Sequence, residues 1–367
     1  MDRPAAAALG ADLRKHVALQ PADLVPDGLI SPADAAALRP VTETFRMRIT
    51  PQMRTAITRA DDGVGLQFVP DRRELNVLPS ELTDPIGDGA HSPTKGITHR
   101  YPDRVIFHVT QVCEVYCRFC FRREVVGENG VLPAGDVAAA LDYIRRTPAI
   151  NEVILTGGDP LSLSPRRLHE ITTALAAIPH VGLMRIHTRV PVVAPNRITP
   201  EMIAALTAPG LQTWLVLHTN HPQEFIPEAG GALEFIPEAV AALDLLRTAG
   251  VPLLSQSVLL RGVNDSVAVL KSLFTTLLRL GVKPYYLHHC DLARGTSHYR
   301  TTIAAGRALM RALRGQISGS ALPTYVLDIP GGFGKVPITA DYFDGGADGR
   351  WQVTDPNGGT HIYHDPE

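Results

Sequence analysis

Three cysteines with metal-ligand spacing, Cys113, Cys117 and Cys120, follow an apolar run that ends at Thr110. Their pattern is Cys-x3-Cys-x2-Cys, and thiolates bind zinc and iron–sulfur clusters. A structural zinc site normally takes four closed ligands, whereas the fourth cysteine, Cys290, is far away in the sequence. Three thiolates instead suit a four-iron cluster with one iron left open for another ligand. Zinc, or three buried cysteines without a metal, remain the alternatives.

A glycine-rich turn, TGGDP, follows the next apolar run and contains Gly157, Gly158 and Asp159. On its own such a turn is a common strand-to-helix connection in α/β proteins. Glycine also permits a close approach of bare backbone to a ligand, and a carboxylate can accept a hydrogen bond from an ammonium group.

A second glycine-rich segment, DIPGGFGKVP, carries Lys335. It is not a P-loop, because the GxxxxGK[ST] spacing is absent. A plain turn with a solvated lysine is one interpretation. A lysine held on flexible glycines also suits reversible Schiff-base chemistry, in which the lysine must move away when a substrate amine displaces it.

The elements that would position these segments alternate between strands and helices from residue 96 onward. Apolar runs predict strands at 105–110, 152–157, 182–188, 211–218, 252–260, 283–289 and 324–329. Helical patterns lie between them at 137–146, 165–178, 200–208, 237–250, 266–281 and 302–315. Six consecutive β/α units predict a parallel sheet, either doubly wound or a partial barrel. In both, function gathers at the C-terminal ends of the strands.

The domain organisation is predicted from the same pattern. Residues 1–95 form an N-terminal extension with short helices expected at 34–38 and in parts of 13–25, and residues 79–95 form a Pro- and Gly-rich loop. Residues 96–330 form the catalytic domain, and residues 331–367 carry the lysine loop and a C-terminal tail. The sequence EFIPEA occurs at 224–229 and again at 234–239, which we interpret as a tolerated loop insertion without a function.

Composition excludes several classes of partner. The net charge of -2 and the pI near 6.7 favour neither nucleic acid nor a membrane surface, and 6% aromatic residues argue against a stacking platform for single strands. The first twenty residues contain no apolar run typical of a signal peptide. No stretch reaches the roughly 18 apolar residues of a membrane span. We therefore expect a cytoplasmic protein.

Six ordered motifs resemble the lysine 2,3-aminomutase family of radical S-adenosylmethionine enzymes. They are HRYPDR, CEVYCRFCFRR, LTGGDP, SQSVLLRGVND, KPYYLHHCDL and DIPGGFGKVP, which span about 98–337. The cysteine spacing, with the aromatic Phe119 before the last cysteine, is the signature of that superfamily. The resemblance implies an α/β fold, an incomplete (β/α)6 barrel with an N-terminal, mainly helical extension.

The resemblance also implies three cofactors and their residues. Cys113, Cys117 and Cys120 match the ligands of a [4Fe–4S] cluster, and Gly157, Gly158, Asp159 and Gln256 match the S-adenosylmethionine site. Lys335, Arg100 and Arg104 match the residues that hold pyridoxal 5′-phosphate, where two guanidiniums on one phosphate make physical sense. Arg122 matches the partner of the substrate carboxylate, and Asp291 with Asp328 match the pair that binds the distal ammonium of lysine.

The implied activity is interconversion of L-α-lysine and β-lysine by migration of the amino group between neighbouring carbons, started by a 5′-deoxyadenosyl radical. The implied partners are L-lysine, an electron donor such as flavodoxin or ferredoxin, and further copies in a homo-oligomer. Two carboxylates in a closed site favour a cationic side chain over glutamate. The alternatives are an aminomutase dedicated to elongation factor P, a mutase of glutamate or another amino acid, and a non-catalytic iron–sulfur carrier.

Some positions depart from the family or stay open. Clostridial members bind zinc through a cysteine directly after GVND, where this chain has Ser266, so we expect that zinc site to be absent. Cys290 is expected to be a buried thiol near Asp291. His288 and His289 are candidates either for cofactor contact or for satisfied core positions.

Overall fold

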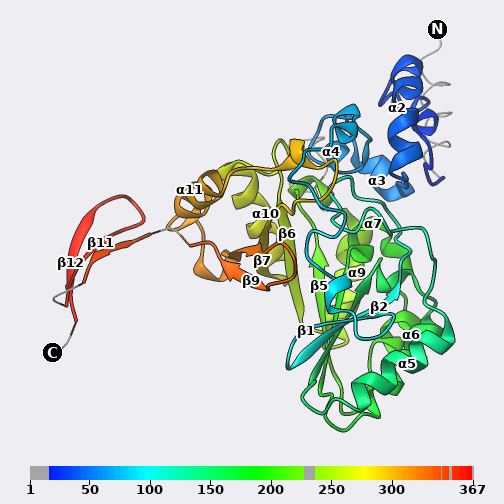
Figure 1. Ribbon diagram of the computed structural model, residues 1–367. Coiled ribbons are helices and arrows are strands. Elements are labelled where there is room, and N and C mark those ends of the chain that lie inside the picture. Colours follow the sequence, from blue (N-terminus) through cyan, green and yellow to red (C-terminus); the bar gives the residue numbers. More distant parts are fainter. Residues whose placement is uncertain (1–15, 227–235, 340, 347–348, 366–367) are drawn as a thin grey trace.

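The main sheet of the protein has nine strands in the order of the sequence, β1 to β9 (Figure 1). The computed structural model describes residues 16–226, 236–339, 341–346 and 349–365. Each crossover moves one strand in the same direction, whereas a doubly wound sheet reverses its order at a switch point. The sheet therefore curls into an open, incomplete barrel, as the resemblance implied.

Seven strands of this sheet, β2 to β8, are parallel to one another. Their bounds are Arg104–Thr110, Glu152–Gly157, Leu183–Thr188, Gln212–His218, Leu253–Leu259, Lys283–His289 and Thr324–Asp328. All seven were predicted from their apolar runs to within one or two residues. Two antiparallel strands that were not predicted flank them: β1, Ile97–Tyr101, pairs with β2, and β9, Lys335–Pro337, pairs with β8.

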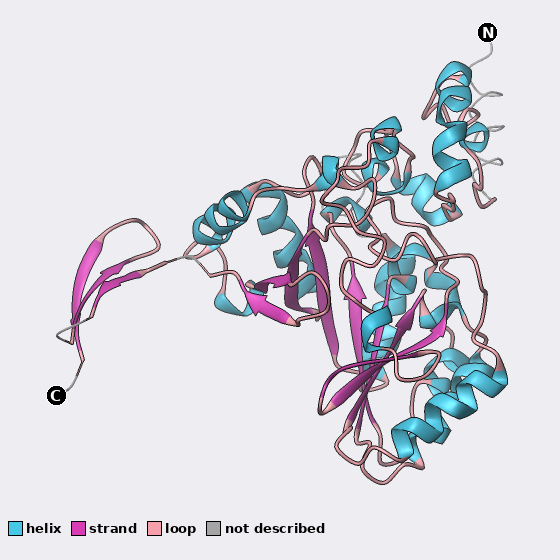
Figure 2. Ribbon diagram, viewed as in Figure 1, coloured by secondary structure: helices cyan, strands magenta, loops and turns pink. Residues whose placement is uncertain are grey.

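Helices cover the convex side of the sheet (Figure 2). The helices that follow strands in the predicted pattern are α5 Ala134–Arg145, α6 Pro165–Ala176, α8 Pro200–Ala205, α9 Pro237–Thr248, α10 Val267–Arg279 and α11 Ile303–Leu313. Hydroxyl side chains begin several of them: Ser164 caps α6, Thr199 caps α8 and Thr302 caps α11. Ser266, at the position of the clostridial zinc cysteine, caps α10 by accepting from Val269 N.

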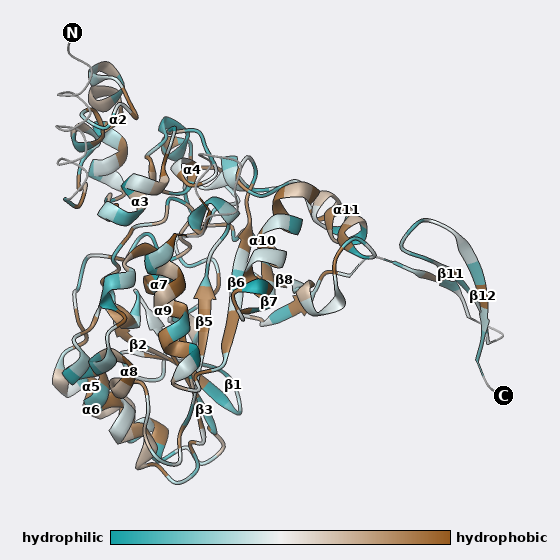
Figure 3. Ribbon diagram, turned by 180° about the vertical axis from the view of Figure 1, so that it is seen from behind, coloured by the Kyte–Doolittle hydropathy of each residue, from teal (hydrophilic) through white to brown (hydrophobic). Residues whose placement is uncertain are grey.

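The side-chain alternation of the strands separates the core from the concave face. On β4 the buried Met184 and Ile186 pack toward the helices, while Arg185 and His187 line the cavity on the concave side. Figure 3 shows the apolar character of β5. The apolar core therefore lies between sheet and helices, and the concave side of the barrel is left for polar chemistry.

The N-terminal extension is partly helical and lies over the C-terminal ends of the strands (Figure 1). It contains η1 Pro21–Leu24, α2 Pro32–Thr44, α3 Pro51–Ala56, α4 Gly65–Phe68, η2 Arg72–Leu75 and η3 Gly89–His91. The predicted helix at 34–38 is the middle of α2, which begins earlier because Ser31 and Asp34 form a capping box. Of the predicted helix in 13–25, residues 13–15 lie outside the described residues.

The C-terminal tail forms a separate three-stranded antiparallel sheet that projects from the barrel (Figure 1). Its strands are β10 Phe343–Gly345, β11 Arg350–Thr354 and β12 Thr360–His364. The prediction that 324–329 is the last strand was wrong. These strands are short, polar and separated by Gly- and Asp-rich turns, so they lack the apolar run that identifies buried parallel strands.

The two EFIPEA copies, at 224–229 and 234–239, are described only in part, because residues 227–235 lie outside the described residues. In the first copy, however, Glu224 is fully buried and accepts hydrogen bonds from Asn220 N, His221 N and Thr219 Oγ1. The second copy leads into α9 at Pro237. The first copy therefore belongs to the core of the fold. No helix within the described residues is long and apolar enough to cross a membrane.

Two neighbouring leucines on α9 test the assignment of the core. Leu246 is fully buried and Leu245 is 42% exposed. Leu246→Ala is expected to lower the free energy of unfolding by about 2–5 kcal/mol, because it removes packed apolar volume. Leu245→Ala is expected to change it by no more than about 0.5 kcal/mol. Urea unfolding followed by circular dichroism measures both, and equal losses would contradict the assignment.

Candidate active site

A cavity of about 730 Å³ lies on the concave side of the sheet and extends from the first residues of several strands, such as Arg104, Glu152 and Leu183, to the C-terminal ends of the strands. It is lined by every residue that the sequence proposed for a site: Arg100, Arg104, Cys113, Cys117, Cys120, Arg122, Gly157, Gly158, Asp159, Gln256, Asp291, Asp328 and Lys335. These residues come from strands and loops that are far apart in the sequence. Cavities of a few hundred cubic ångströms typically hold small molecules.

The loop that carries Cys113, Cys117 and Cys120, here called the cysteine loop, follows β2 directly. Its three free thiols face the cavity. The side chain between two of them, Arg118, points the other way and is only 1% exposed. Backbone contacts fix the loop against the N-terminal extension: Tyr116 N donates to Arg48 O and Arg118 N donates to Gln67 O, both at 2.9 Å. The extension therefore forms the back wall of the cysteine site.

A buried ion cluster holds the same loop from behind. The fully buried carboxylate of Glu74 accepts from Arg118 Nε at 3.0 Å and Arg118 Nη2 at 2.5 Å, and it also pairs with Arg123. Arg118 Nη1 donates to Arg46 O at 2.8 Å, and the Arg123 guanidinium lies 3.6 Å from the centre of the Phe45 ring. One carboxylate of η2 thus pairs with two arginines of the loop. Sequence reasoning missed Glu74.

A second buried cation contacts the cysteines from the side of β4. Arg189 Nη1 donates to Cys117 Sγ at 3.0 Å, and Nη2 donates to Glu224 Oε2 at 2.9 Å. Burial alone would raise the pKa of the Glu224 carboxyl, but the charge of Arg189 and hydrogen bonds from Asn220 N, Gln67 and Arg189 together hold that pKa below its usual value. The alternation of Arg185, His187 and Arg189 along an otherwise apolar strand is the signal that could have identified these cavity residues from the sequence.

The two glycines of TGGDP are required by close packing of backbone. A Cβ atom on Gly157, whose φ is +110°, would lie 2.3 Å from Thr110 O, and one on Gly158 would lie 2.3 Å from Val112 O. The end of β3 is therefore pressed against the residues that lead into the cysteine loop. This gives the glycines a structural role besides the ligand approach that the sequence suggested.

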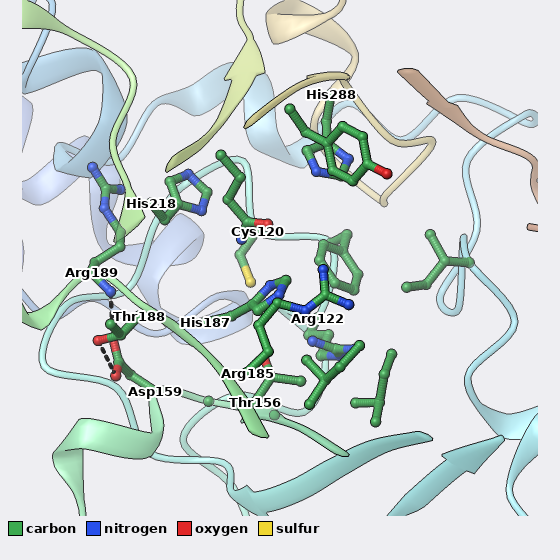
Figure 4. A pocket seen from close by; sticks show the side chains of 18 of the residues that line it. Cys120, Arg122, Thr156, Asp159, Arg185, His187, Thr188, Arg189, His218 and His288 are labelled. Atoms are coloured by element: carbon green, nitrogen blue, oxygen red, sulfur yellow. Dashed lines mark hydrogen bonds between the residues drawn. The ribbon is translucent and has the colours of Figure 1, made fainter. Parts of the chain in front are cut away.

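Asp159 joins the ends of β3 and β4. Its Oδ1 accepts from Thr188 Oγ1 at 2.7 Å and Leu161 N at 3.1 Å, and its Oδ2 accepts from Arg189 N at 2.7 Å (Figure 4). Burial raises the pKa of this carboxyl to about 6. A carboxylate has about four acceptor positions, so these three bonds leave room for one further donor.

Several buried nitrogens on the cavity wall have no hydrogen-bond partner within the described residues. They are Arg100 Nε, Arg185 Nε, Arg189 Nε and His187 Nε2. Figure 4 shows Arg122, Arg185 and His187 around the same space. Burial lowers the pKa of His187, which keeps its ring neutral. Buried donors without partners are costly, so this wall indicates a cavity built for anionic or polar ligands.

The opposite wall combines a lysine with two carboxyl groups. Lys335 pairs with Asp328, whose other oxygen contacts His288 Nδ1 at 3.0 Å. The His288 contact and the Lys335 charge outweigh burial and hold the pKa of Asp328 below its usual value. Burial, together with the negative charge of Asp328, raises the pKa of Asp291 to about 7.

The structure decides the open positions next to these carboxyl groups. His288 lines the cavity, whereas His289 Nδ1 contacts Tyr325 OH at 2.7 Å and is not part of the cavity wall. Cys290 is a buried thiol, as predicted, and packs in a small apolar cluster with Phe119, Leu260, Val263 and Tyr299.

Known proteins resemble this chain over most of its length. The profile of the Radical SAM superfamily matches residues 107–272, and a profile described as Lysine-2,3-aminomutase matches residues 310–367. L-lysine 2,3-aminomutase of Fusobacterium nucleatum is 41% identical over 89% of this chain and 75% of that protein. L-lysine 2,3-aminomutase of Clostridium subterminale is 43% identical over 82% and 70%. Glutamate 2,3-aminomutase of Clostridioides difficile is 37% identical over 83% and 70%.

The ion cluster behind the cysteines gives a stability prediction. Glu74→Gln keeps the shape of the side chain and leaves two buried guanidiniums without their counter-charge. It is expected to lower the free energy of unfolding of the metal-free protein by about 3–5 kcal/mol. The control Asp71→Asn removes the charge of a partly exposed pair with Arg73 at the N-terminal cap of η2, where asparagine can still cap, and is expected to cost at most about 1 kcal/mol. Urea unfolding measures both, and a stable Glu74→Gln protein would contradict the proposed role of the cluster.

Proposed function

The chain belongs to the lysine 2,3-aminomutase family of radical S-adenosylmethionine enzymes, and we propose that it interconverts L-α-lysine and β-lysine. The observation that carries this proposal is the cavity itself. One cavity brings together three cysteine thiols, a lysine on a glycine-rich segment and a pair of carboxyl groups suited to a second ammonium group. The reaction moves one amino group between the α- and β-carbons and leaves the distal ammonium unchanged.

The cofactors of this family are a [4Fe–4S] cluster, S-adenosylmethionine and pyridoxal phosphate, and the cavity residues fit them. Three thiols supply the donor set of a cluster with one open iron. The unpartnered Nε atoms of Arg100, Arg185 and Arg189 suit the phosphate and carboxylate groups of the two organic cofactors. When bound, these groups supply a carbon radical for hydrogen abstraction and an aldehyde that carries the substrate amine.

We assign Cys113, Cys117 and Cys120 to the cluster, and Gly157, Gly158, Asp159 and Gln256 to S-adenosylmethionine. The Arg189 guanidinium donates a hydrogen bond to Cys117 Sγ and so fixes the position of this thiol beside the cavity. The acceptor position left on Asp159 suits an ammonium group.

We assign Arg100, Arg104 and Lys335 to pyridoxal phosphate. The Arg104 guanidinium lies 3.9 Å from the centre of the Tyr101 ring, and the Tyr101 hydroxyl accepts from Lys335 N at 2.9 Å. The hairpin of β1 and β2, which carries Arg100, Tyr101 and Arg104, therefore contacts the segment of Lys335. The glycines before Lys335 adopt positive φ, which lets the segment turn tightly and present the amine to the cavity.

We assign Arg122 to the substrate carboxylate, and Asp291 and Asp328 to the distal ammonium. In the unliganded chain, Lys335 itself supplies the cation that Asp328 pairs with. Were Lys335 engaged with pyridoxal phosphate, Asp328 would be open to another cation, and the distal ammonium of lysine would suit that place. A glutamate side chain would instead bring a third carboxylate to this wall, which favours lysine as the substrate.

Two related functions are weighed against the same cavity. An aminomutase dedicated to elongation factor P makes the same product, and no feature of the cavity favours it over a general lysine enzyme. A glutamate mutase is disfavoured by Asp291 and Asp328.

We further propose that residues 96–330 are the catalytic domain between the 1–95 extension and the 331–367 tail. We also propose that the protein acts in the cytoplasm as a homo-oligomer that receives electrons from a flavodoxin or ferredoxin.

Turnover with labelled L-lysine tests the proposed function. Anaerobically reconstituted protein with dithionite, S-adenosylmethionine and pyridoxal phosphate is expected to form β-lysine, detected by mass spectrometry. Cys117→Ala and Lys335→Ala are each expected to abolish the formation of β-lysine. Lys335→Ala is also expected to abolish the absorbance of protein-bound pyridoxal phosphate. L-glutamate assayed in parallel is expected to turn over more slowly. Faster turnover of glutamate would contradict the roles of Asp291 and Asp328.

The raised pKa of Asp291 gives a pH prediction. Its carboxyl has a pKa of about 7, so it is neutral below that pH and becomes a carboxylate above it. Only the carboxylate attracts the distal ammonium of lysine. The kcat/KM for lysine is therefore expected to rise by up to about tenfold per unit as pH increases toward 7 and then to level off. Binding of pyridoxal phosphate over the same range is the control, and a fall of kcat/KM between pH 6 and 8 would contradict the role of Asp291.

A further inference from the structure

One carboxylate outside the cavity wall connects two arginines that belong to it. Asp88 Oδ1 accepts from Arg100 Nη2 at 3.0 Å, and Asp88 Oδ2 accepts from Arg122 Nε at 2.9 Å. The Arg122 Nη2 atom lies 2.9 Å from the same oxygen, so Arg122 is held along one whole edge of its guanidinium. All three side chains are largely buried, at 7%, 12% and 19% exposure for Arg100, Arg122 and Asp88.

Asp88 binds the two guanidiniums from outside the cavity. Arg100 and Arg122 line the cavity, and Asp88 is not among its lining residues. Arg100 Nε, on the other hand, is buried without a partner within the described residues. Because the two arginines line the cavity and Asp88 does not, an anion in the cavity can approach them while Asp88 keeps its contacts. A fixed guanidinium loses less side-chain freedom when it binds an anion than a mobile one does.

The loop that carries Asp88 is itself fixed in place. The Asp84 carboxylate accepts from Asp88 N at 2.9 Å and Gly89 N at 2.8 Å. Gly87 has a φ of +65°, and a Cβ atom there would lie 2.4 Å from Gly331 O. The loop thus packs directly against the glycine-rich segment that ends in Lys335. This contact places Asp88 where β1, the cysteine loop and the lysine segment meet.

The charges of this group also require Asp88. Two buried guanidiniums beside each other repel, and a shared carboxylate offsets that repulsion before any ligand is present. One positive charge remains in excess, and this favours entry of anionic groups from the cavity. Both arginines point to the same place only while this carboxylate lies between them.

We propose that Asp88 is a positioning residue that holds Arg100 and Arg122 toward the cavity, so that one carboxylate aligns the cofactor phosphate and the substrate carboxylate relative to each other. This inference rests on the proposed function, because it takes the roles of the two arginines from it. The contacts of Asp88 with Arg100 and Arg122 support the inference independently of those roles. Asp88 touches neither cofactor nor substrate and acts through the arginines.

The test compares Asp88→Asn with wild type in two binding steps. The dissociation constant of pyridoxal phosphate, from an absorbance titration, and the KM for lysine are each expected to rise by about tenfold or more. The kcat is expected to stay within about threefold, because the arginines, once engaged, still serve the bound groups. Asp88→Glu keeps the charge and is expected to recover at least part of both losses. Asp136→Asn, which breaks a surface pair with Lys95, is the matched control.

The outcomes separate this inference from the proposed function. Iron content and the circular dichroism spectrum of Asp88→Asn are expected to match wild type, and a loss of iron would overturn the inference, because the effect would then run through the cysteine loop. An unchanged or lower dissociation constant for pyridoxal phosphate together with an unchanged or lower KM for lysine would also overturn the inference, even if wild type makes β-lysine. If wild type makes no β-lysine but Asp88→Asn weakens cofactor binding, the inference for Arg100 stands and the proposed function falls.

Discussion

The cysteine loop imposes a constraint on which the rest of the site depends. To present three thiols on one side, the loop must turn Arg118 and Arg123 to the other side, where they are buried. Buried cations are tolerated only with a counter-charge. Glu74 of the N-terminal extension supplies that charge, and backbone carbonyls of Phe45 and Arg46 take up the remaining donors of Arg118. The extension is therefore part of the cysteine site, although it lies outside the barrel.

The interior of a closed (β/α)8 barrel is filled with packed side chains, whereas this open barrel encloses a cavity that polar side chains of β4 help to line. Here the apolar side chains of β4 face the helices, and Arg185 and His187 face the cavity. An open sheet of this kind leaves room for about 730 Å³ of space between its walls. Because parallel strands all end at the same edge, the cysteine loop, the TGGDP turn and the Asp291 segment meet there without any long connection.

Charge pairing prepares this space before ligands arrive. Asp88 serves Arg100 and Arg122, Glu224 serves Arg189, and Asp328 serves Lys335. Each cation of the cavity named here has a carboxylate behind or beside it, so that the empty site is not strongly self-repelling. The unpartnered Nε atoms then remain for ligands. The same pairs fix the directions of the side chains, which reduces the entropy lost on binding.

The sequence by itself determined the seven parallel strands, six helices between them and the candidate site residues, all of which line the cavity. Those signals are local: apolar runs, capping hydroxyls such as Ser164, the cysteine spacing and the glycines before Asp159 and Lys335. Only the tertiary structure decided which carboxylates pair with the arginines of the cavity wall and of the cysteine loop. Glu74 is 44 residues from Arg118, Asp88 is 34 from Arg122 and Glu224 is 35 from Arg189. Pairing over such separations leaves no periodic trace in the sequence, because the partners meet only when the chain has folded around them.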